Sequence, residues 1–328
     1  SGLTKKFMLF PSYMSYWEGH WDNSLRNFGV EFVLKKPLDF PEFKKAMDQF
    51  GDLAAKVPFI QDAVGTSVHV HMNVQNRTLI EIGNLLTLLV LFENILVEYS
   101  GEQRRSNLFA LPIRCAEMNY WNIRNLFRDL AEGKLKAIQF NEEHVKYACV
   151  NLGKLSKIGS IEIRCFRGSV KKEEIVDWVD ILRHIKEFAC TPRLTPIAIM
   201  AEMRDRPLEF FSEVFGRHAK TLRRMEDFEK HLMSSEVAQN LFYASEILAA
   251  CDWDRLEGIV KEASMVKYPE KILRYIQRYA SHLSPDQLMV DANGEVVMKN
   301  DSNNPVVIDY GDSFEASNEP EIPAQAAQ

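Results

Sequence analysis

A strand followed at once by an apolar helix constrains the fold more than any other stretch of this sequence. Residues from Gly65 to Asn73 alternate between polar and apolar side chains. Because neighbouring side chains of a strand point to opposite faces, Ser67, His69, His71 and Asn73 share one face and the apolar residues occupy the other. A strand with one apolar face and one imidazole-bearing face is typical of the wall of a site.

The helix that follows has a clear start and a clear end. Thr78 and Glu81 form the Thr-x-x-Glu pattern of a capping box, and Gly101 ends a Leu-rich run, so a helix is predicted from Leu79 to Ser100. Four polar residues interrupt the run, which argues against a membrane span: Glu81, Asn84, Glu93 and Asn94. Strand and helix together are predicted to form the centre of the fold.

Composition excludes several classes of protein. The 328 residues are 46% hydrophobic and 26% charged, as in soluble globular proteins. The net charge is −6, and because residues 291–321 alone carry −7, the rest of the chain is close to neutral. We therefore expect neither a nucleic-acid partner nor a membrane partner. The five cysteines are widely spaced without a Cys-x-x-Cys motif, and the start lacks a signal-peptide pattern. A cytoplasmic protein is therefore predicted.

The remaining elements indicate an α+β protein. Further strands are predicted at 29–34 and 159–166, with a hairpin that pairs 288–290 and 295–298. Helices are predicted at 40–50, 120–132, 141–152, 171–190 and across most of 197–282, with breaks near Pro207 and Gly216. We expect an α+β domain at 1–190, a helical region at 191–285 and a flexible acidic tail at 286–328.

Polar side chains on three of these strands suggest one kind of chemistry. Glu31 lies between apolar residues on the first strand, and Glu162 and Arg164 share a face of the strand at 159–166. Two carboxylates with the imidazoles of His69 and His71 suit Mg²⁺ or Mn²⁺, and Arg164 could hold a phosphate beside the metal. A metal ion and an arginine at one groove are what phosphoryl transfer requires.

Each of these residues also has a simpler interpretation. The histidines could be hydrogen-bonded residues of a half-exposed strand, and Glu162 and Arg164 could form an ion pair on a solvated face. Glu31 could pair with Arg26. Zinc hydrolysis is the competing use of His-x-His. Three more residues, which more often indicate packing, are left out of the predicted site: Tyr147, Asn151 and Trp178.

The order of the motifs resembles the amidoligase family. The resemblance rests on Asp22-x-Ser-Leu-Arg26, Gly29-Val-Glu31, Pro37-Leu38, His69-Val-His71, Arg105-Ser-Asn107 and Ser160-Ile-Glu-Ile-Arg164 with Arg167, over about residues 20–190. The family is related to glutamine synthetase and glutamate–cysteine ligase, and many members are phage-encoded. The resemblance therefore implies a curved antiparallel sheet with packed helices, in a host cytoplasm or a virion if the chain is phage-encoded.

The resemblance also implies a reaction and roles for residues. ATP and Mg²⁺ (or Mn²⁺) would activate a carboxylate substrate as an acyl phosphate, which an amine substrate then displaces to form an amide or isopeptide bond. Glu31, His69 and Glu162 would bind metal, and His69, His71 and Arg164 would contact the nucleotide. Catalytic contacts would come from four residues: Arg164, Arg167, Arg105 and Asn107.

One departure from the family pattern motivates a second hypothesis. Family members begin with an acidic Gly-x-Glu-x-Glu strand, and no such strand is recognisable before Asp22. Either the chain has lost its beginning, in line with Ser1, or its metal site is depleted. In the second case the protein would be a ligase-like scaffold, or an assembly component of a virus particle. Relatives of glutamine synthetase often assemble, so a homo-oligomer is also expected.

Overall fold

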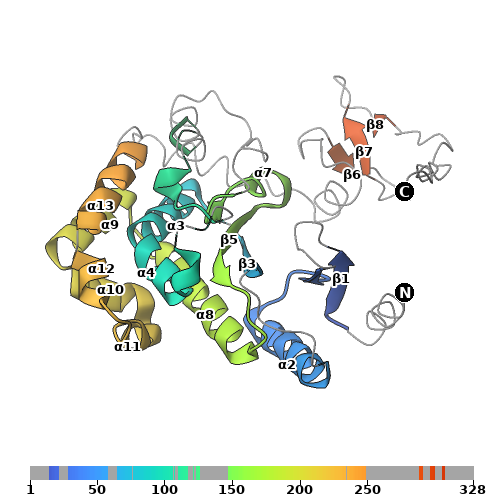
Figure 1. The fold of residues 1–328 in the computed structure, drawn as a ribbon. Helices are drawn as coiled ribbons and strands as arrows, with labels where there is room; N and C mark the ends of the chain where they lie inside the picture. Colours follow the sequence, from blue (N-terminus) through green and yellow to red (C-terminus); the bar gives the residue numbers. More distant parts are fainter. Residues whose placement is uncertain are drawn as a thin grey trace, which may run out of the picture. The chain divides into compact units, whose positions relative to one another are not determined.

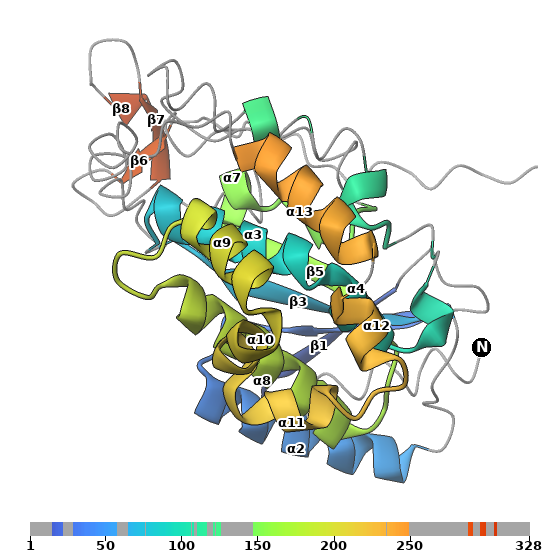
Figure 2. The same cartoon turned by 90° about the vertical axis from the view of Figure 1, so that its left-hand side faces the viewer.

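The computed structural model is a mixed helix-and-sheet protein with small antiparallel sheets (Figures 1 and 2). It describes residues 15–21, 29–57, 65–75, 77–105, 107, 110–116, 121, 123–125, 147–233, 235–248, 288–290, 296–299 and 305–306. Residues 1–267 form one compact unit and 268–328 form a second. The α+β class is confirmed, whereas the domain boundaries near residues 190 and 285 stay predictions.

Three antiparallel sheets are described. β1 (Trp17–Trp21) pairs with β2 (Val30–Leu34). β5 (Ser160–Arg167) lies between β3 (Ser67–Asn73) and the short β4 (Val150–Asn151). In the second unit, β7 (Val296–Lys299) lies between β6 (Leu288–Val290) and β8 (Pro305–Val306), which confirms the predicted hairpin. Its predicted turn lies outside the described residues.

The predicted long helix is two helices. α3 (Leu79–Leu91) begins with the predicted capping box, in which Thr78 Oγ1 accepts from the Glu81 amide at 3.2 Å and Glu81 Oε2 accepts from the Thr78 amide at 2.7 Å. After Phe92 the chain turns by 62° into α4 (Glu93–Tyr99). Phe92 is fully buried against three aromatic rings of the next helical layer, so tertiary packing fixes the bend at this residue.

Among the described residues, no single helix is long and apolar enough to cross a membrane, and only the bent pair α3–α4 passes by length and composition. Polar side chains of this pair make hydrogen bonds inside the protein. The Asn84 side chain donates to the carbonyls of Ala189 and Leu194, both at 3.0 Å, and Glu93 Oε1 accepts from the Ile113 amide at 2.8 Å. α3 and α4 are thus the centre of the core.

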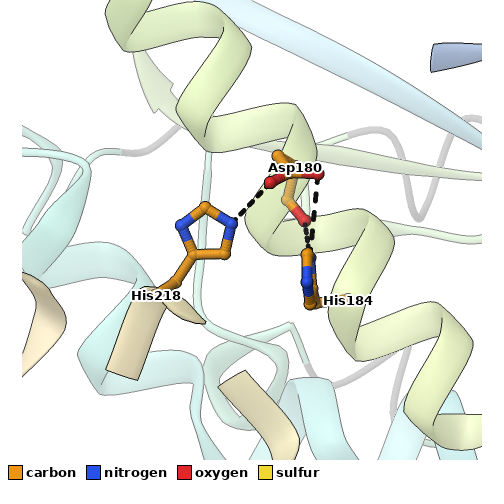
Figure 3. A group of neighbouring side chains, drawn as sticks. All are labelled: Asp180, His184 and His218. Carbon is orange, nitrogen blue, oxygen red and sulfur yellow. Dashed lines mark hydrogen bonds and ion pairs between the residues drawn. The ribbon is translucent and has the colours of Figure 1, made fainter. Parts of the chain in front are cut away.

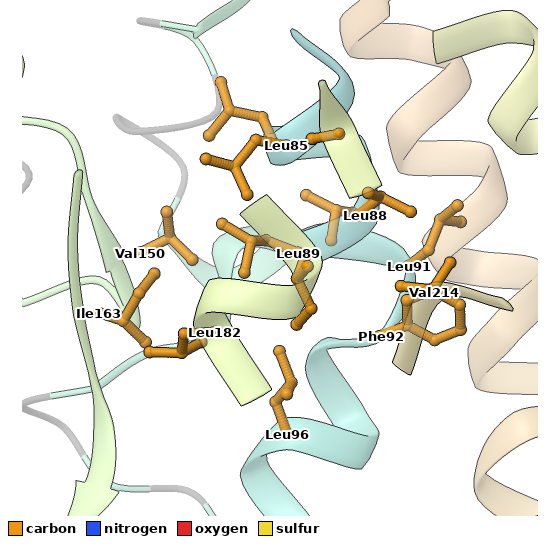
Figure 4. Packing of buried hydrophobic residues seen from close by; sticks show 14 of the residues in the cluster. Leu85, Leu88, Leu89, Leu91, Phe92, Leu96, Val150, Ile163, Leu182 and Val214 are labelled. Carbon is orange, nitrogen blue, oxygen red and sulfur yellow. The ribbon is translucent and has the colours of Figure 1, made fainter. Parts of the chain in front are cut away.

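The helices of the first unit form two layers beside its sheets. α8 (Lys172–Ala189) packs beside α3, and α2 (Phe40–Lys56) packs on α8 with a separate aromatic cluster beneath β1 and β2. Beyond α3 lie α9 (Pro196–Asp205), α10 (Pro207–Phe215) and α13 (Ser235–Leu248). Figure 4 shows α3 between the sheet residues Val150 and Ile163 on one side and Val214 of α10 on the other.

Short elements complete the first unit. They are the helical turns η1 (Glu102–Arg104), η2 (Ile113–Cys115) and η3 (Gly216–His218), and the helices α7 (Leu155–Ile158), α11 (Ala219–Leu222) and α12 (Phe228–Met233). The breaks predicted near Pro207 and Gly216 are confirmed. The helix predicted at 120–132 is described only at 121 and 123–125, and the helical pattern after residue 248 lies outside the described residues.

The predicted helix at 141–152 is wrong at its end. Residues 141–146 are outside the described residues, but Val150 and Asn151 form strand β4, paired with Ile163 and Glu162 of β5. Pairing with a neighbouring strand decides this conformation, because it satisfies buried backbone groups that local sequence preference does not count.

Candidate functional site

The candidate site is centred on Glu162, in the middle of the three-stranded sheet. Its side chain is 5% exposed. Arg164, two residues along β5, donates from Nη1 to Glu162 Oε1 at 2.8 Å, and His69 Nδ1 lies 3.2 Å from the same oxygen. His71 Nε2 lies 3.9 Å from it. The predicted shared faces of β3 and β5 therefore meet at a single carboxylate oxygen.

The other oxygen of Glu162 is bound by the third strand. Asn151 of β4 donates from Nδ2 to Glu162 Oε2 at 2.6 Å, and its own Oδ1 accepts from the Gly153 amide at 2.8 Å. The amide group is therefore held in one orientation, with its donor toward the carboxylate. We call Glu162, Arg164, His69, His71 and Asn151 the Glu162 cluster.

Both imidazoles of the cluster are held neutral. Burial, with a further contribution from the Arg164 guanidinium, lowers the pKa of His69 to about 4, although Glu162 acts in the opposite sense. Burial also lowers the pKa of His71. A carboxylate only accepts hydrogen bonds, so Nδ1 of His69 carries the proton and Nε2 accepts from Ser67 Oγ at 2.8 Å. Neutral imidazole is the form that binds metal ions.

A β-bulge in β5 shapes the site. Val68 pairs with Phe166 whereas Val70 pairs with Ile163, so two residues of β5, 164 and 165, lie opposite His69. Arg104 of η1, 4% exposed, donates from Nε to the carbonyl of Cys165 and from Nη2 to the carbonyl of Arg164, both at 2.9 Å. The buried guanidinium thereby fixes the backbone that carries Arg164.

Arg105, one of the two predicted loop residues, is paired with a neighbouring helix. Arg105 has a half-exposed side chain that pairs with Glu98 of α4, with Nε 2.6 Å from Oε2. The half-buried Asn107 accepts from the Ala110 amide through its backbone carbonyl at 3.0 Å. The ion pair of Arg105 thus joins it to α4, and its neighbour Arg104 is the arginine that reaches β5.

Arg167 is anchored at the end of β5. Its Nη2 donates to Glu174 Oε2 of α8 at 2.8 Å, and its Nη1 donates to the carbonyls of Tyr99 and Ser100, both at 3.4 Å. These contacts join the strand to α4 and α8. Its predicted role at the rim of a catalytic site stays a prediction.

Glu31 lies on a different sheet from the cluster. It is exposed on β2, opposite His20 of β1, and Glu18 and His20 lie 3.4 Å apart on the same strand. Residues two apart on a strand share a face, as do directly opposite residues, so Glu18, His20 and Glu31 share the outer face of this sheet. Among the described residues, β2 pairs with β1 in a sheet separate from that of β3 and β5, and the role of Glu31 as a metal ligand stays a prediction. Arg26, the alternative partner of Glu31, is outside the described residues.

β1 was missed from the sequence. It lies before Asp22, where no strand was recognised, and it carries one acidic residue, Glu18. The alternation of aromatic and polar residues from Trp17 to Trp21 was the available signal. Asn151 and Arg104 were missed as well. Asn151 was assigned to packing in a predicted helix, and nothing in the local sequence separates Arg104 from Arg105.

The fold and the site together place the protein in the class of mixed α+β proteins with a polar site on an antiparallel sheet. The strands of that sheet carry a carboxylate, an arginine and two neutral imidazoles. Residues 37–186, just under half of the chain, match the family described as "putative amidoligase enzyme". The resemblance found from the motifs is thus confirmed for this segment, and the family description names a ligase. No curated protein and no solved structure matches the chain.

Proposed function

We propose that the protein is an ATP-dependent carboxylate–amine ligase whose reaction site is the Glu162 cluster. The single observation that carries the proposal is the convergence of Glu162, Arg164, His69 and His71 inside the segment that matches the amidoligase family. The sheet would correspond to one wall of a curved, glutamine-synthetase-like sheet. The proposed reaction is the same if the chain is a phage-encoded member of the family.

The donor set suits a nucleotide with a divalent cation. Glu162 Oε1 and His71 Nε2 would be ligand atoms for Mg²⁺ or Mn²⁺, and His69 would join them through Nδ1 once its proton has moved to Nε2, on the side of Ser67. Mg²⁺ is commonly bound by one or two carboxylates together with substrate phosphates. When bound, the cation would neutralise the developing charge on the phosphate oxygens. Glu31 on β2 keeps the role that the family resemblance implies, that of a further carboxylate ligand.

The remaining residues bind and orient. The Arg164 guanidinium can bind phosphate or carboxylate through two parallel hydrogen bonds, so it would hold the transferred phosphoryl group beside the acid substrate. Its Nε is buried without a hydrogen-bond partner, and hence still has one N–H to donate. Asn151 and Arg104 hold Glu162 and Arg164 in place. Arg105 and Arg167 would contact substrate only after leaving part of their present ion pairs, and Asn107 is the remaining predicted substrate contact.

The substrates follow from this chemistry. The carboxylate of one substrate would become an acyl phosphate at the expense of ATP, and the amine of the other would attack it, with inorganic phosphate leaving and an amide forming. Small molecules, peptides and protein side chains all carry the required groups.

Calorimetric titration of ATP, with Mg²⁺ or Mn²⁺ and again with chelator, tests the proposal without knowledge of the substrates. Metal-dependent binding is expected for the native chain and not for Glu162→Gln, which removes the charge and keeps the shape. Glu213→Gln on α10 is the matched control, because Glu213 is an exposed carboxylate paired with Arg206. Binding that is equal in the two variants would contradict the assignment of the site.

A catalytically depleted scaffold is the alternative function. Two observations favour it: Glu162 is the one carboxylate of the Glu162 cluster as defined above from the described residues, and both its oxygens already accept hydrogen bonds. Absence of ATP binding at millimolar concentration, in a folded chain with its natural beginning, would support the scaffold. Stoichiometric incorporation into a larger assembly would then be its direct test.

A further inference from the structure

A second cluster of ligand-type side chains lies on α8 and η3, apart from the sheet (Figure 3). Asp180 and His184 are one helical turn apart on α8, and His218 closes the cluster from η3. His218 Nε2 lies 2.6 Å from Asp180 Oδ2, and His184 Nδ1 lies 3.7 Å from Asp180 Oδ1. The three ligand atoms all lie within 4.8 Å of one another.

The backbone holds His218 over α8. Phe215 at the end of α10 is fully buried, and Gly216 follows it with φ +50°, a conformation that side-chain-bearing residues rarely adopt. Because of this turn, α10 ends against α8 and the next two residues reach Asp180. Packing of α10 against α8, and not spacing along the sequence, therefore brings His218 to Asp180 and His184.

The two imidazoles use different ring nitrogens in their present contacts: His184 uses Nδ1 and His218 uses Nε2. His184 Nδ1 donates to the backbone carbonyl of Asp180 at 2.9 Å, so its Nε2 is left as the ligand atom. Such a bond from the second ring nitrogen to a carbonyl is how metal-binding histidines are commonly oriented. The His184 and His218 rings meet edge to face, with centroids 4.9 Å apart. Their side chains are 22% and 12% exposed, which leaves an approach for a small ion.

The carboxylate of Asp180 is buried and is surrounded by cationic side chains. It is 3% exposed and contacts two arginines: Arg183 Nε donates to Oδ1 at 2.9 Å, and Arg217 donates to Oδ2. Arg183 is held further by Glu187 and by the Phe40 ring, whereas the Arg217 side chain is 63% exposed.

We propose that Asp180, His184 and His218 form a zinc site, in which Zn²⁺ replaces the Arg217 guanidinium at Asp180 Oδ2. Two imidazoles and one carboxylate are ligands that suit Zn²⁺, and three protein ligands leave a fourth position for water. Zn–N and Zn–O bonds of about 2.0–2.2 Å place tetrahedral ligand atoms about 3.3 Å from one another. His218 Nε2 and Asp180 Oδ2, which are 2.6 Å apart here, would therefore separate to admit the ion between them. The ion would fix η3 and the end of α10 to α8.

The site is separate from the Glu162 cluster, and its presence does not depend on the ligase proposal. No residue is shared between the two. A zinc ion at this position would stabilise the folded chain, since a ligand that binds only the native state shifts unfolding by mass action.

Calorimetric titration of Zn²⁺ into the full chain, after treatment with a chelator, tests the proposal. We expect one equivalent of Zn²⁺ that is retained in Glu162→Gln and whose affinity falls at least tenfold in His184→Gln and in His218→Gln. The glutamine of His218→Gln can still donate to Asp180, so the fold should survive, which circular dichroism would check. Arg217→Gln removes the competing cation and should raise the affinity about tenfold.

Cobalt gives an independent readout of the geometry. Co²⁺ added in place of Zn²⁺ should give the visible absorption of a tetrahedral site, and that band should be lost in His218→Gln. Absence of a bound equivalent in the native chain would overturn the proposal. So would zinc affinity that is unchanged in both histidine variants, or lost instead in Glu162→Gln.

Discussion

Replacement of Arg104 tests whether a buried arginine holds the bulge on which the candidate site is built. In Arg104→Met an apolar side chain of similar reach takes the place of the guanidinium. The two hydrogen bonds to the carbonyls of Arg164 and Cys165 are lost, and both carbonyls stay buried. Hydrogen bonds to charged groups contribute about 1.5–3 kcal/mol each, so the loss of stability should be about 3 kcal/mol or more.

Arg105→Met is the matched control, one residue away. Its guanidinium is half exposed and pairs with Glu98 at the surface, and exposed ion pairs contribute only about 0–1 kcal/mol. Urea unfolding of the two variants beside the native chain would give the two free-energy differences. Arg104→Lys, which keeps the charge but loses the two-pronged geometry, should fall between them.

The reasoning fails if Arg104→Met and Arg105→Met lose the same amount. It also fails if Arg104→Met is destabilised but leaves the pairing of β5 unchanged by amide hydrogen exchange, since the bulge would then be fixed by something else. Local loss of protection at residues 163–166, with α8 still protected, is the expected pattern.

Two further predictions concern the Glu162 cluster. Because the pKa of His69 falls from 6.5 to about 4 on folding, its neutral form stabilises the folded state fully above pH 6.5, and up to about 3 kcal/mol is lost as the pH falls toward 4. The difference in unfolding free energy between the native chain and His69→Gln should vary over this range and stay constant above it. Asn151→Leu leaves Glu162 Oε2 without its described donor and should cost about 1–3 kcal/mol, measured by urea unfolding with Asn94→Leu, at a half-buried position, as the control.

Local chemistry made part of the fold predictable. The capping box at Thr78 and the alternation through His69 and His71 depend on residues within one turn or one strand, and both were found in the structure. The shared face of Glu162 and Arg164 was predictable for the same reason, and their hydrogen bond agrees with it.

Features set by pairing between distant segments were not predictable in this way. The bulge in β5 is defined only by its register with β3, and Asn151 became part of the cluster only through its pairing with Glu162. Glu31 was grouped with the other polar strands because it also alternates with apolar residues. Its partner strand, β1, decides which face it occupies, and alternation alone contains no information on partners.

Under the proposed function, the charge of the Glu162 cluster predicts that metal binding and nucleotide binding depend on each other. With both imidazoles neutral, the carboxylate of Glu162 is balanced by the guanidinium of Arg164, so these residues together carry no net charge. A nucleotide triphosphate brings several negative charges into a half-buried site, where uncompensated charge is costly. Arg164 cannot offset them while it is paired with Glu162. A divalent cation bound at Glu162 Oε1 would displace the guanidinium from the carboxylate and free it for the phosphate. Addition of the metal thus supplies two charges and releases a third, which is why ATP without metal should not bind.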